Sequence, residues 1–419
     1  MTVNRPRRRW LAGLPALGAI GALGATGVLG TLGGWPATVS AAVSATVSAT
    51  VSAACPWPLY QQFLSRFVQE DGRVLDPSTR EQHSTSEGQS YGMVFALVAN
   101  DRATFDRLWQ WSIANLGAGS LQDKLPAWQW GRRSDGSWGV IDANAAADAD
   151  LWFAFALLEA ARLWRQPRYA AQARALLALA AKQEVVPLPG FGAMLLPAPQ
   201  GFAEGTEDGP RQWRLNASYL PVPLLRRLAG ADPSGPWGTL AAQAGRFVEA
   251  VARQGIVPDW SAYRADQGGT GFLTDPVKGD VSSYDAIRVY LWAGMTPRGD
   301  AAGRVLMKAL APQAQRMAGR AAPPERMHAD SGALEGDGPA GFSAALVPFL
   351  QAAGSPAAAA QRARAETMID AGGKSAATYY DTVLGLFGLG FAEGRYRFAP
   401  SGQLELEWEK TCRTASARP

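Results

Sequence analysis

The sequence predicts an all-α fold in which a ring of buried helices is enclosed by a ring of amphipathic helices. Three observations support this prediction. About a dozen segments have helical periodicity and are separated by loops rich in Pro and Gly, with hardly any alternating β pattern. The segment 145–164 carries Leu, Trp and Phe around most of its circumference, so it should be buried on nearly all sides. No repeat of about 30 to 45 residues is visible, which argues against an open solenoid.

The helices expected in chain order cover residues 58–67, 86–100, 103–116, 145–164, 167–184, 221–227, 238–254, 283–292, 301–316, 342–351, 355–365 and 375–390. A loop at 117–142 separates the third helix from the fourth. It contains Trp128-Gln129-Trp130-Gly131 and a turn at Ser134-Asp135-Gly136, so we expect a short hairpin there.

Length and composition predict one large domain. The 419 residues are 47% hydrophobic and include 15 Trp, 10 Tyr and 15 Phe, which suffice for a large core. We expect a single domain over 55–412, after a segment 1–54 and before a disordered tail at 413–419. The formal charge of +4 equals the four arginines before Cys55, so the rest of the chain is neutral. A neutral protein has no net electrostatic reason to bind nucleic acid or an anionic membrane, and we expect a monomer.

The first 54 residues have the pattern of a secretory signal. Arg7-Arg8-Arg9-Trp10-Leu11 has a twin-arginine character, and the stretch to Gly34 is rich in Gly, Ala and Leu. Small-residue sites then favour cleavage near Ala53 or Ala54 and a periplasmic or secreted protein. A transmembrane anchor is the alternative, since the apolar run is long enough to span a bilayer. Ser52-Ala53-Ala54 lacks the Leu of a good lipobox, which disfavours lipidation of the next residue.

The two cysteines lie at the two ends of the mature chain. In an oxidising compartment Cys55 and Cys412 can form one bridge that ties the termini together, with two unpaired thiols as the alternative. Only two cysteines and two widely separated histidines are present, so no thiolate or imidazole metal site can be assembled. We expect no cofactor.

Acidic residues open three of the strongly apolar helices. Ser86 and Gln89 have the spacing of a capping box, which places Glu87 in the first turn of its helix. Ser282 and Asp285 repeat that spacing. The remaining two acids, Asp148 and Asp150, begin the helix that should be buried on nearly all sides, and Arg288 follows Asp285 by one turn. Each acid alone is explained by the helix dipole.

Together, the three acidic sites indicate a cleft. If the inner helices run parallel, their N-termini gather at one face, where buried carboxylates are costly unless they are paired or functional. Flat aromatic rings in or beside loops suit the C–H faces of sugars, although core packing explains any one of them equally well. Paired carboxylates with aromatic platforms imply glycoside hydrolysis, with one protonated acid and one ionised base. Residues expected to bind substrate are Trp128, Trp130, Asp150, Trp213, Tyr219, Tyr284, Arg288 and Tyr380.

A serine hydrolase is disfavoured. Gly88-Gln89-Ser90-Tyr91-Gly92 spells the G-x-S-x-G of a nucleophile elbow, which requires a buried strand just before the serine. The preceding 81–85 is polar and has no apolar run. Only His83 and His328 are available as the catalytic histidine, and His328 lies in a polar, Pro-flanked stretch.

Several motifs resemble one known family. They are Thr85-Ser86-Glu87-Gly88-Gln89-Ser90-Tyr91-Gly92-Met93, Leu125-Pro126-Ala127-Trp128, Asp148-Ala149-Asp150, Asn216-Ala217-Ser218-Tyr219-Leu220-Pro221, Ser282-Ser283-Tyr284-Asp285-Ala286-Ile287-Arg288-Val289-Tyr290 and Gly341-Phe342-Ser343-Ala344-Ala345. With them the sequence resembles glycoside hydrolase family 8 from Cys55 to Cys412. Within that family it is most similar to the periplasmic endo-1,4-β-glucanases that accompany bacterial cellulose synthases.

The resemblance implies an (α/α)6 barrel and an inverting mechanism. By it, Glu87 corresponds to the general acid, Asp285 to the general base, and Asp148 to the carboxylate that holds the sugar at the cleavage point. Ala147 and Phe153 depart from the family pattern, which has Ser or Thr before this aspartate and Ile or Met five residues after it. The implied substrate is the β-1,4-glucan of cellulose and the implied partner a cellulose synthase complex. Alternatives are xylan, chitosan or mixed-linkage glucan, or a non-catalytic glucan-binding role.

Overall fold

The computed structural model describes residues 56–205, 209–370 and 377–410, all within one compact unit. The expectations for the N-terminal signal, for a Cys55–Cys412 bridge and for the C-terminal tail lie outside these residues. Over the described ranges, no helix has both the length and the apolar character needed to cross a bilayer.

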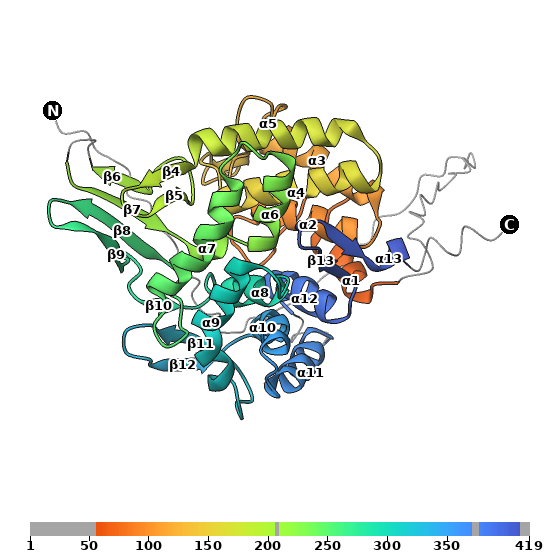
Figure 1. The fold of residues 1–419 in the computed structure, drawn as a ribbon. Coiled ribbons are helices and arrows are strands. Elements are labelled where there is room, and N and C mark those ends of the chain that lie inside the picture. Colours follow the sequence, from red (N-terminus) through yellow and green to blue (C-terminus); the bar gives the residue numbers. More distant parts are fainter. Residues whose placement is uncertain (1–55, 206–208, 371–376, 411–419) are drawn as a thin grey trace, which may run out of the picture. The chain divides into compact units, whose positions relative to one another are not determined.

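Twelve long helices in the described residues alternate between an outer and an inner position, as the sequence predicts (Figure 1). The outer helices are α1 (Pro58–Phe67), α3 (Arg102–Asn115), α5 (Pro167–Gln183), α7 (Trp237–Val251), α9 (Ala301–Arg316) and α11 (Ala357–Asp370). The inner helices are α2 (Ser86–Val98), α4 (Ala147–Leu163), α6 (Val222–Ala231), α8 (Ile287–Met295), α10 (Ala340–Ala352) and α12 (Tyr379–Ala392). Each inner helix after the first packs against the inner helix before it. The fold is an (α/α)6 barrel.

The barrel core is aromatic where the inner helices meet. Phe387 of α12 lies 5.2 Å from Tyr91 and 4.8 Å from Phe95 of α2, between ring centroids. The same ring lies 5.4 Å from Trp152 of α4 and 5.3 Å from Trp292 of α8. Edge and tilted contacts of this kind add to the free energy of burying the rings. The aromatic core thus ties α2, α4, α8 and α12 together.

Two glycines let inner helices approach with their backbones in contact. A Cβ atom at Gly388 of α12 would overlap the carbonyl oxygen of Ala344 in α10. A Cβ atom at Gly294 of α8 would overlap the backbone of Phe349 on α10. Side chains at either position would push α10 away from its neighbours, which explains glycine inside these helices despite its low helix propensity.

Within the described ranges, short antiparallel strands form five small sheets outside the barrel. They are β1 (Ser84–Thr85), β2 (Gln129–Arg132) and β3 (Trp138–Asp142); β4 (Val185–Leu188) and β5 (Gly192–Leu195); β6 (Ala203–Gly205), β7 (Arg211–Leu215), β8 (Ser261–Asp266) and β9 (Gly269–Thr274); β10 (Val281–Ser282), β11 (Pro324–His328) and β12 (Leu334–Asp337); and β13 (Tyr396–Phe398) and β14 (Leu404–Leu406), followed by the short helix α13 (Glu407–Lys410). The β2–β3 hairpin confirms the prediction for the loop at 117–142.

The four-stranded sheet β6–β9 was not predicted. Figure 1 shows it extending from the helices beside α7. Its two edge strands have no alternation that a sequence pattern detects, because all three residues of β6 are exposed and none of β9 is buried. Tyr263 of β8 packs on Phe272 of β9, with ring centroids 4.9 Å apart. This sheet is therefore stabilised by aromatic packing between its strands and by the burial of most of β8.

The helix starts at Glu87 and Asp285 differ in detail from the prediction. Thr85 is the N-cap of α2, since its hydroxyl accepts the N–H of Gly88. The capping-box assignment for Ser86 and Gln89 is wrong, because the buried Gln89 amide donates to the carbonyls of Gly72 and Leu108 instead. Helix α8 begins only at Ile287, so Asp285 lies in the preceding turn and Ser282 does not cap it.

Candidate active site

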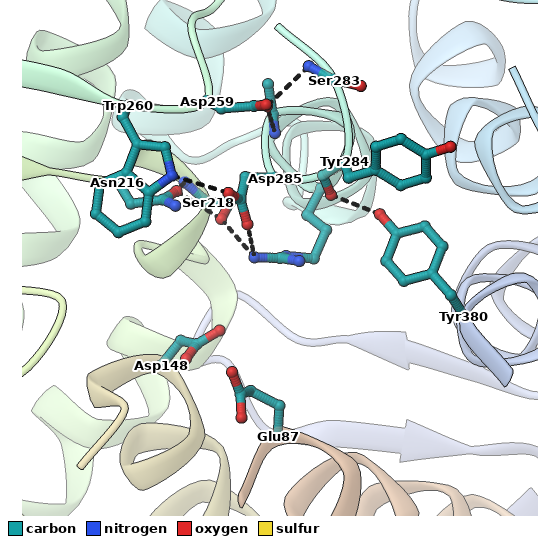
Figure 2. Close-up of polar contacts among 12 residues, drawn as sticks. Glu87, Asp148, Asn216, Ser218, Asp259, Trp260, Ser283, Tyr284, Asp285 and Tyr380 are labelled. Carbon is teal, nitrogen blue, oxygen red and sulfur yellow. Dashed lines mark hydrogen bonds and ion pairs between the residues drawn. The ribbon is translucent and has the colours of Figure 1, made fainter. Parts of the chain in front are cut away.

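The N-terminal ends of the inner helices meet at one end of the barrel, as predicted. Glu87 lies in the first turn of α2, Asp148 in the first turn of α4, and Asp285 in the turn that leads into α8. The Tyr91 hydroxyl of α2 donates to Asp148 Oδ2 at 3.3 Å, which joins the first two helices directly. Figure 2 shows Glu87 and Asp148 on one side and Asp285 on the other.

Glu87 is a carboxyl group whose surroundings favour its protonated form. Pairing of β1 with β2 places Trp128 beside it, and the Trp128 indole N–H donates to Glu87 Oε1 at 3.1 Å. Burial raises the pKa of Glu87 above its usual value, although Arg288 and the Trp128 hydrogen bond oppose the shift. The sequence placed this carboxyl at a helix N-terminus, which lowers a pKa, so burial outweighs the helix dipole.

Asp148 is almost completely buried beside Glu87. Its carboxyl is 2% exposed and accepts the N–H of Ala149 at 2.9 Å, in addition to the Tyr91 hydroxyl. Burial, followed by the charge of Glu87, raises the pKa of Asp148 to about 8. The two neighbouring carboxyls therefore resist carrying two negative charges at once.

Asp285 is held by two donors on separate elements. Arg288 Nη2 lies 3.0 Å from Asp285 Oδ1, and the Trp260 indole N–H donates to Oδ2 at 3.0 Å. The same arginine nitrogen donates to Ser218 Oγ at 2.9 Å, in the 3-10 helix η1 (Ala217–Tyr219). The Asp285 side chain is 30% exposed. A carboxyl group in a fixed orientation, with access to solvent, is suited to activating a water molecule.

The comparisons with known proteins assign the family. Residues 34–394 match the family model described as Glycosyl hydrolases family 8. The chain belongs to this family. Among its relatives, an "Endoglucanase" of Xanthomonas axonopodis is 46% identical over 356 residues, which cover 84% of this chain and 90% of the relative. An "Endoglucanase" of Pseudomonas fluorescens is 43% identical over 373 residues, covering 85% and 93%.

A solved structure supports the same assignment. The endo-1,4-D-glucanase from Vibrio fischeri has 35% sequence identity and a TM-score of 0.78, covering 85% of this chain and all of that chain. This family 8 protein is therefore a glycoside hydrolase with the barrel described above.

Four of the predicted aromatics lie at this family 8 site. Trp128 contacts Glu87, and burial together with the charges of Asp148 and Glu87 raises the pKa of Tyr219. At the rim, Tyr284 is 43% exposed and its ring lies 5.5 Å from that of Tyr380. The Tyr380 hydroxyl donates to the Tyr284 carbonyl at 2.5 Å.

Two other predicted aromatics pack elsewhere. Trp213 is 4% exposed in β7, where its ring lies 6.1 Å from Tyr263 and faces the sheet β6–β9. Trp130 lies on the hairpin, with ring centroids 5.4 Å from Trp111 and 5.6 Å from Trp138. These contacts are packing contacts of the sheets, so neither ring joins the carboxylates.

Asp150 does not join the carboxylates either. It is 1% exposed and forms a pair with Glu184, which follows α5 and is completely buried. Apart from the pair itself, no N–H or O–H of the described residues donates to either carboxyl. Burial raises the pKa of both, that of Glu184 to about 8. Two buried carboxyls without a donor avoid a double charge by sharing a proton.

Several residues at the site were not recognised individually from the sequence. Ser218 lies within the Asn216-Ala217-Ser218-Tyr219 motif, which was the available signal. Asp259 and Glu184 support the site through contacts distant in sequence, for which no local pattern exists. In the described ranges, no group of three or more His, Cys, Asp or Glu side chains is arranged to hold a metal ion.

Proposed function

We propose that this glycoside hydrolase is an inverting endo-1,4-β-glucanase that cleaves internal bonds of cellulose. The observation that carries the proposal is the pair of unlike carboxyls: Glu87 is favoured in its protonated form, and Asp285 is held by Arg288 and Trp260. Endoglucanase activity is supported by the relatives at 43% and 46% identity, both of which carry that name.

In the proposed mechanism the two carboxyls act in one step. Glu87 gives its proton to the glycosidic oxygen, and that oxygen leaves with the electron pair of the bond to the anomeric carbon. Asp285 takes a proton from a water molecule, whose oxygen attacks the same carbon from the opposite face. Asp148 lies beside Glu87 and would hold the sugar at the cleavage point. Room for water requires the two carboxyls to be about 6.5–9.5 Å apart.

The test is the release of reducing ends from carboxymethylcellulose by the mature chain. Glu87→Gln should abolish turnover while leaving glucan binding intact, since the amide keeps the shape and cannot donate an acidic proton. Glu366→Gln, on the outer helix α11, is a matched control that should retain full activity. Proton NMR of the first product should show the α anomer. An initial β anomer, or substantial hydrolysis by Glu87→Gln, would reject this mechanism.

The substrate is decided by running xylan and chitosan in parallel. Release from carboxymethylcellulose alone supports the β-1,4-glucanase. Release mainly from another polymer keeps the mechanism and overturns the substrate. Binding of glucan without release from any polymer supports the second candidate, a non-catalytic binding role, which the joint presence of Glu87 and Asp285 disfavours.

We further propose that the protein is exported and trims nascent glucan beside a cellulose synthase complex. Export is supported by the arginine-rich, small-residue N-terminus, and the role beside a cellulose synthase by the resemblance to the glucanases that accompany such synthases. Cell fractionation tests the location: the shortened chain should be found in the periplasm or medium. Deletion of the gene in a cellulose-producing host should change the length or bundling of the polymer, and unchanged cellulose would reject the role.

A further inference from the structure

Asp259 lies behind the proposed base, on the segment between α7 and β8. Its Oδ1 accepts the N–H of Ser283 at 2.7 Å and the N–H of Ala286 at 2.7 Å (Figure 2). These two donors bracket Tyr284 and Asp285, so one oxygen closes the turn that carries the base. The Asp259 N–H in turn donates to the Val281 carbonyl at 2.7 Å, which fixes Asp259 to the start of the same turn.

Helix α8 supplies no side-chain cap for this turn. The N-cap residue Ala286 has no side chain that can cap the helix, and Asp285 precedes the helix, with its carbonyl accepting the N–H of Arg288 at 3.1 Å. The oxygen of Asp259 takes the place of the missing cap, since it satisfies the Ala286 N–H from outside the helix. Residues 259 and 260 therefore act on Asp285 together: Asp259 holds its backbone turn, and Trp260 holds its carboxylate.

Trp260 is itself fixed, which makes the arrangement rigid. Its ring stacks on Phe202 at 5.6 Å between centroids, and the Arg214 guanidinium lies 5.2 Å from the ring. Arg214 is paired with the buried Asp275, with Nε to Oδ2 at 2.7 Å. A support held by several elements keeps the Asp285 carboxylate in one orientation.

The charge of Asp259 is not what the turn requires. The charged groups that face it are Asp285 and Arg288, and burial together with the Asp285 charge raises the pKa of Asp259 to about 7. Below that pH the carboxyl is largely neutral and its oxygen still accepts both N–H groups. A neutral acceptor also avoids a second negative charge beside the base.

We propose that Asp259 is a positioning residue for Asp285, which it serves as a hydrogen-bond acceptor that closes the turn presenting the base to water. This inference rests on the proposed function of Asp285 as the base. It makes a clear distinction between two substitutions. Asp259→Asn keeps a neutral oxygen acceptor, whereas Asp259→Leu keeps a similar volume and removes the acceptor.

The experiment measures kcat and KM at pH 5.5 with the mature chain, on the polymer that the wild type cleaves. Asp259→Leu should lower kcat about 10- to 100-fold with KM within about twofold, because misplacement of a catalytic group slows the step without weakening substrate binding. Asp259→Asn should restore kcat to within about threefold of the wild type. Asp266→Asn, on the hairpin β8–β9, is the control and should match the wild type.

Two results would overturn the proposal. One is a kcat for Asp259→Leu within threefold of the wild type. The other is a folded Asp259→Asn protein, with wild-type circular dichroism, that loses kcat more than about tenfold, since the acceptor alone would then be insufficient. If Asp259→Leu does not fold, the Asp259→Asn arm can still refute the proposal. Asp285→Asn separates this inference from the proposed function: an active Asp285→Asn protein rejects the base itself, whatever the Asp259 variants do.

Discussion

The buried pair of Asp150 and Glu184 makes the stability of the protein depend on pH in an unusual direction. Glu184 is completely buried, and its pKa is raised from 4.5 to about 8 in the folded protein. A carboxyl with a raised pKa in the fold binds a proton more tightly when folded than when unfolded. Its contribution to stability is therefore fully present below pH 4.5 and is lost as the pH rises toward 8.

The size of the effect follows from the shift. Within this pH window each unit lowers the free energy of unfolding by up to about 1.4 kcal/mol per group. Between pH 5 and pH 7 Glu184 thus removes up to about 3 kcal/mol. Gln at this position cannot titrate, and its amide N–H can donate to Asp150. We expect Glu184→Gln to be more stable than the wild type at pH 7, by a margin that shrinks as the pH is lowered to 5.

Urea unfolding followed by tryptophan fluorescence, at pH 5 and pH 7, measures this margin. The quantity that matters is the difference between variant and wild type at each pH, because other groups that titrate cancel in it. Glu159→Gln is the control: Glu159 is equally buried but pairs with Arg162 at 2.7 Å and Arg227 at 2.6 Å. Removing the Glu159 charge leaves both arginines without their partner, which should destabilise the protein at both pH values by about 3–5 kcal/mol. If the free energy of unfolding changes equally with pH in the wild type and in Glu184→Gln, the shared-proton description of the pair is refuted.

Three further substitutions test the site and the barrel. Trp128→Phe removes the hydrogen bond that lowers the pKa of Glu87, so the alkaline limb of the kcat/KM profile should move to higher pH; an unchanged limb would remove Trp128 from this role. Arg288→Lys cannot hold Asp285 and Ser218 in the same geometry and should lower kcat about 100-fold in the reducing-end assay; a wild-type kcat contradicts this. Gly388→Ala should lower the free energy of unfolding by about 1–3 kcal/mol in urea, because its methyl group overlaps α10; equal stability would show that α10 shifts freely.

The helices were predictable because their burial repeats locally. The segment predicted at 145–164 became α4 at Ala147–Leu163, whose residues from Ala147 to Ala160 are all buried. Only the sequence of the segment itself was needed to see this. The sheet β6–β9 was not predictable in this way, because Trp213 of β7 packs on Tyr263 of β8, a strand much later in the chain. Pairing of that kind leaves no periodic pattern in any one strand.

The residues of the candidate site also differ in whether the sequence alone could predict their placement. Glu87, Asp148 and Asp285 were found because acids before apolar helices are conspicuous, and the parallel inner helices bring them together. Asp150 has the same local pattern, yet it points to Glu184 rather than to the other carboxyls. The two acids of Asp148-Ala149-Asp150 are separated by about 200° around a helix, so they cannot face the same side. Helical geometry alone therefore predicts that only one of these two acids lines the site.

The proposed acid and base show why one position in the fold can serve two roles. Both carboxyls come from the N-terminal end of an inner helix, where the helix dipole favours the ionised form. At Glu87 burial opposes the dipole and prevails, with the Asp148 carboxyl close by. Asp285 instead lies two residues before its helix, held by Arg288 and Trp260 and partly open to solvent. Displacing the base from the helix requires something else to hold its turn. The contacts of Asp259 with the N–H groups of Ser283 and Ala286 hold the turn. Loss of this acceptor should therefore lower kcat.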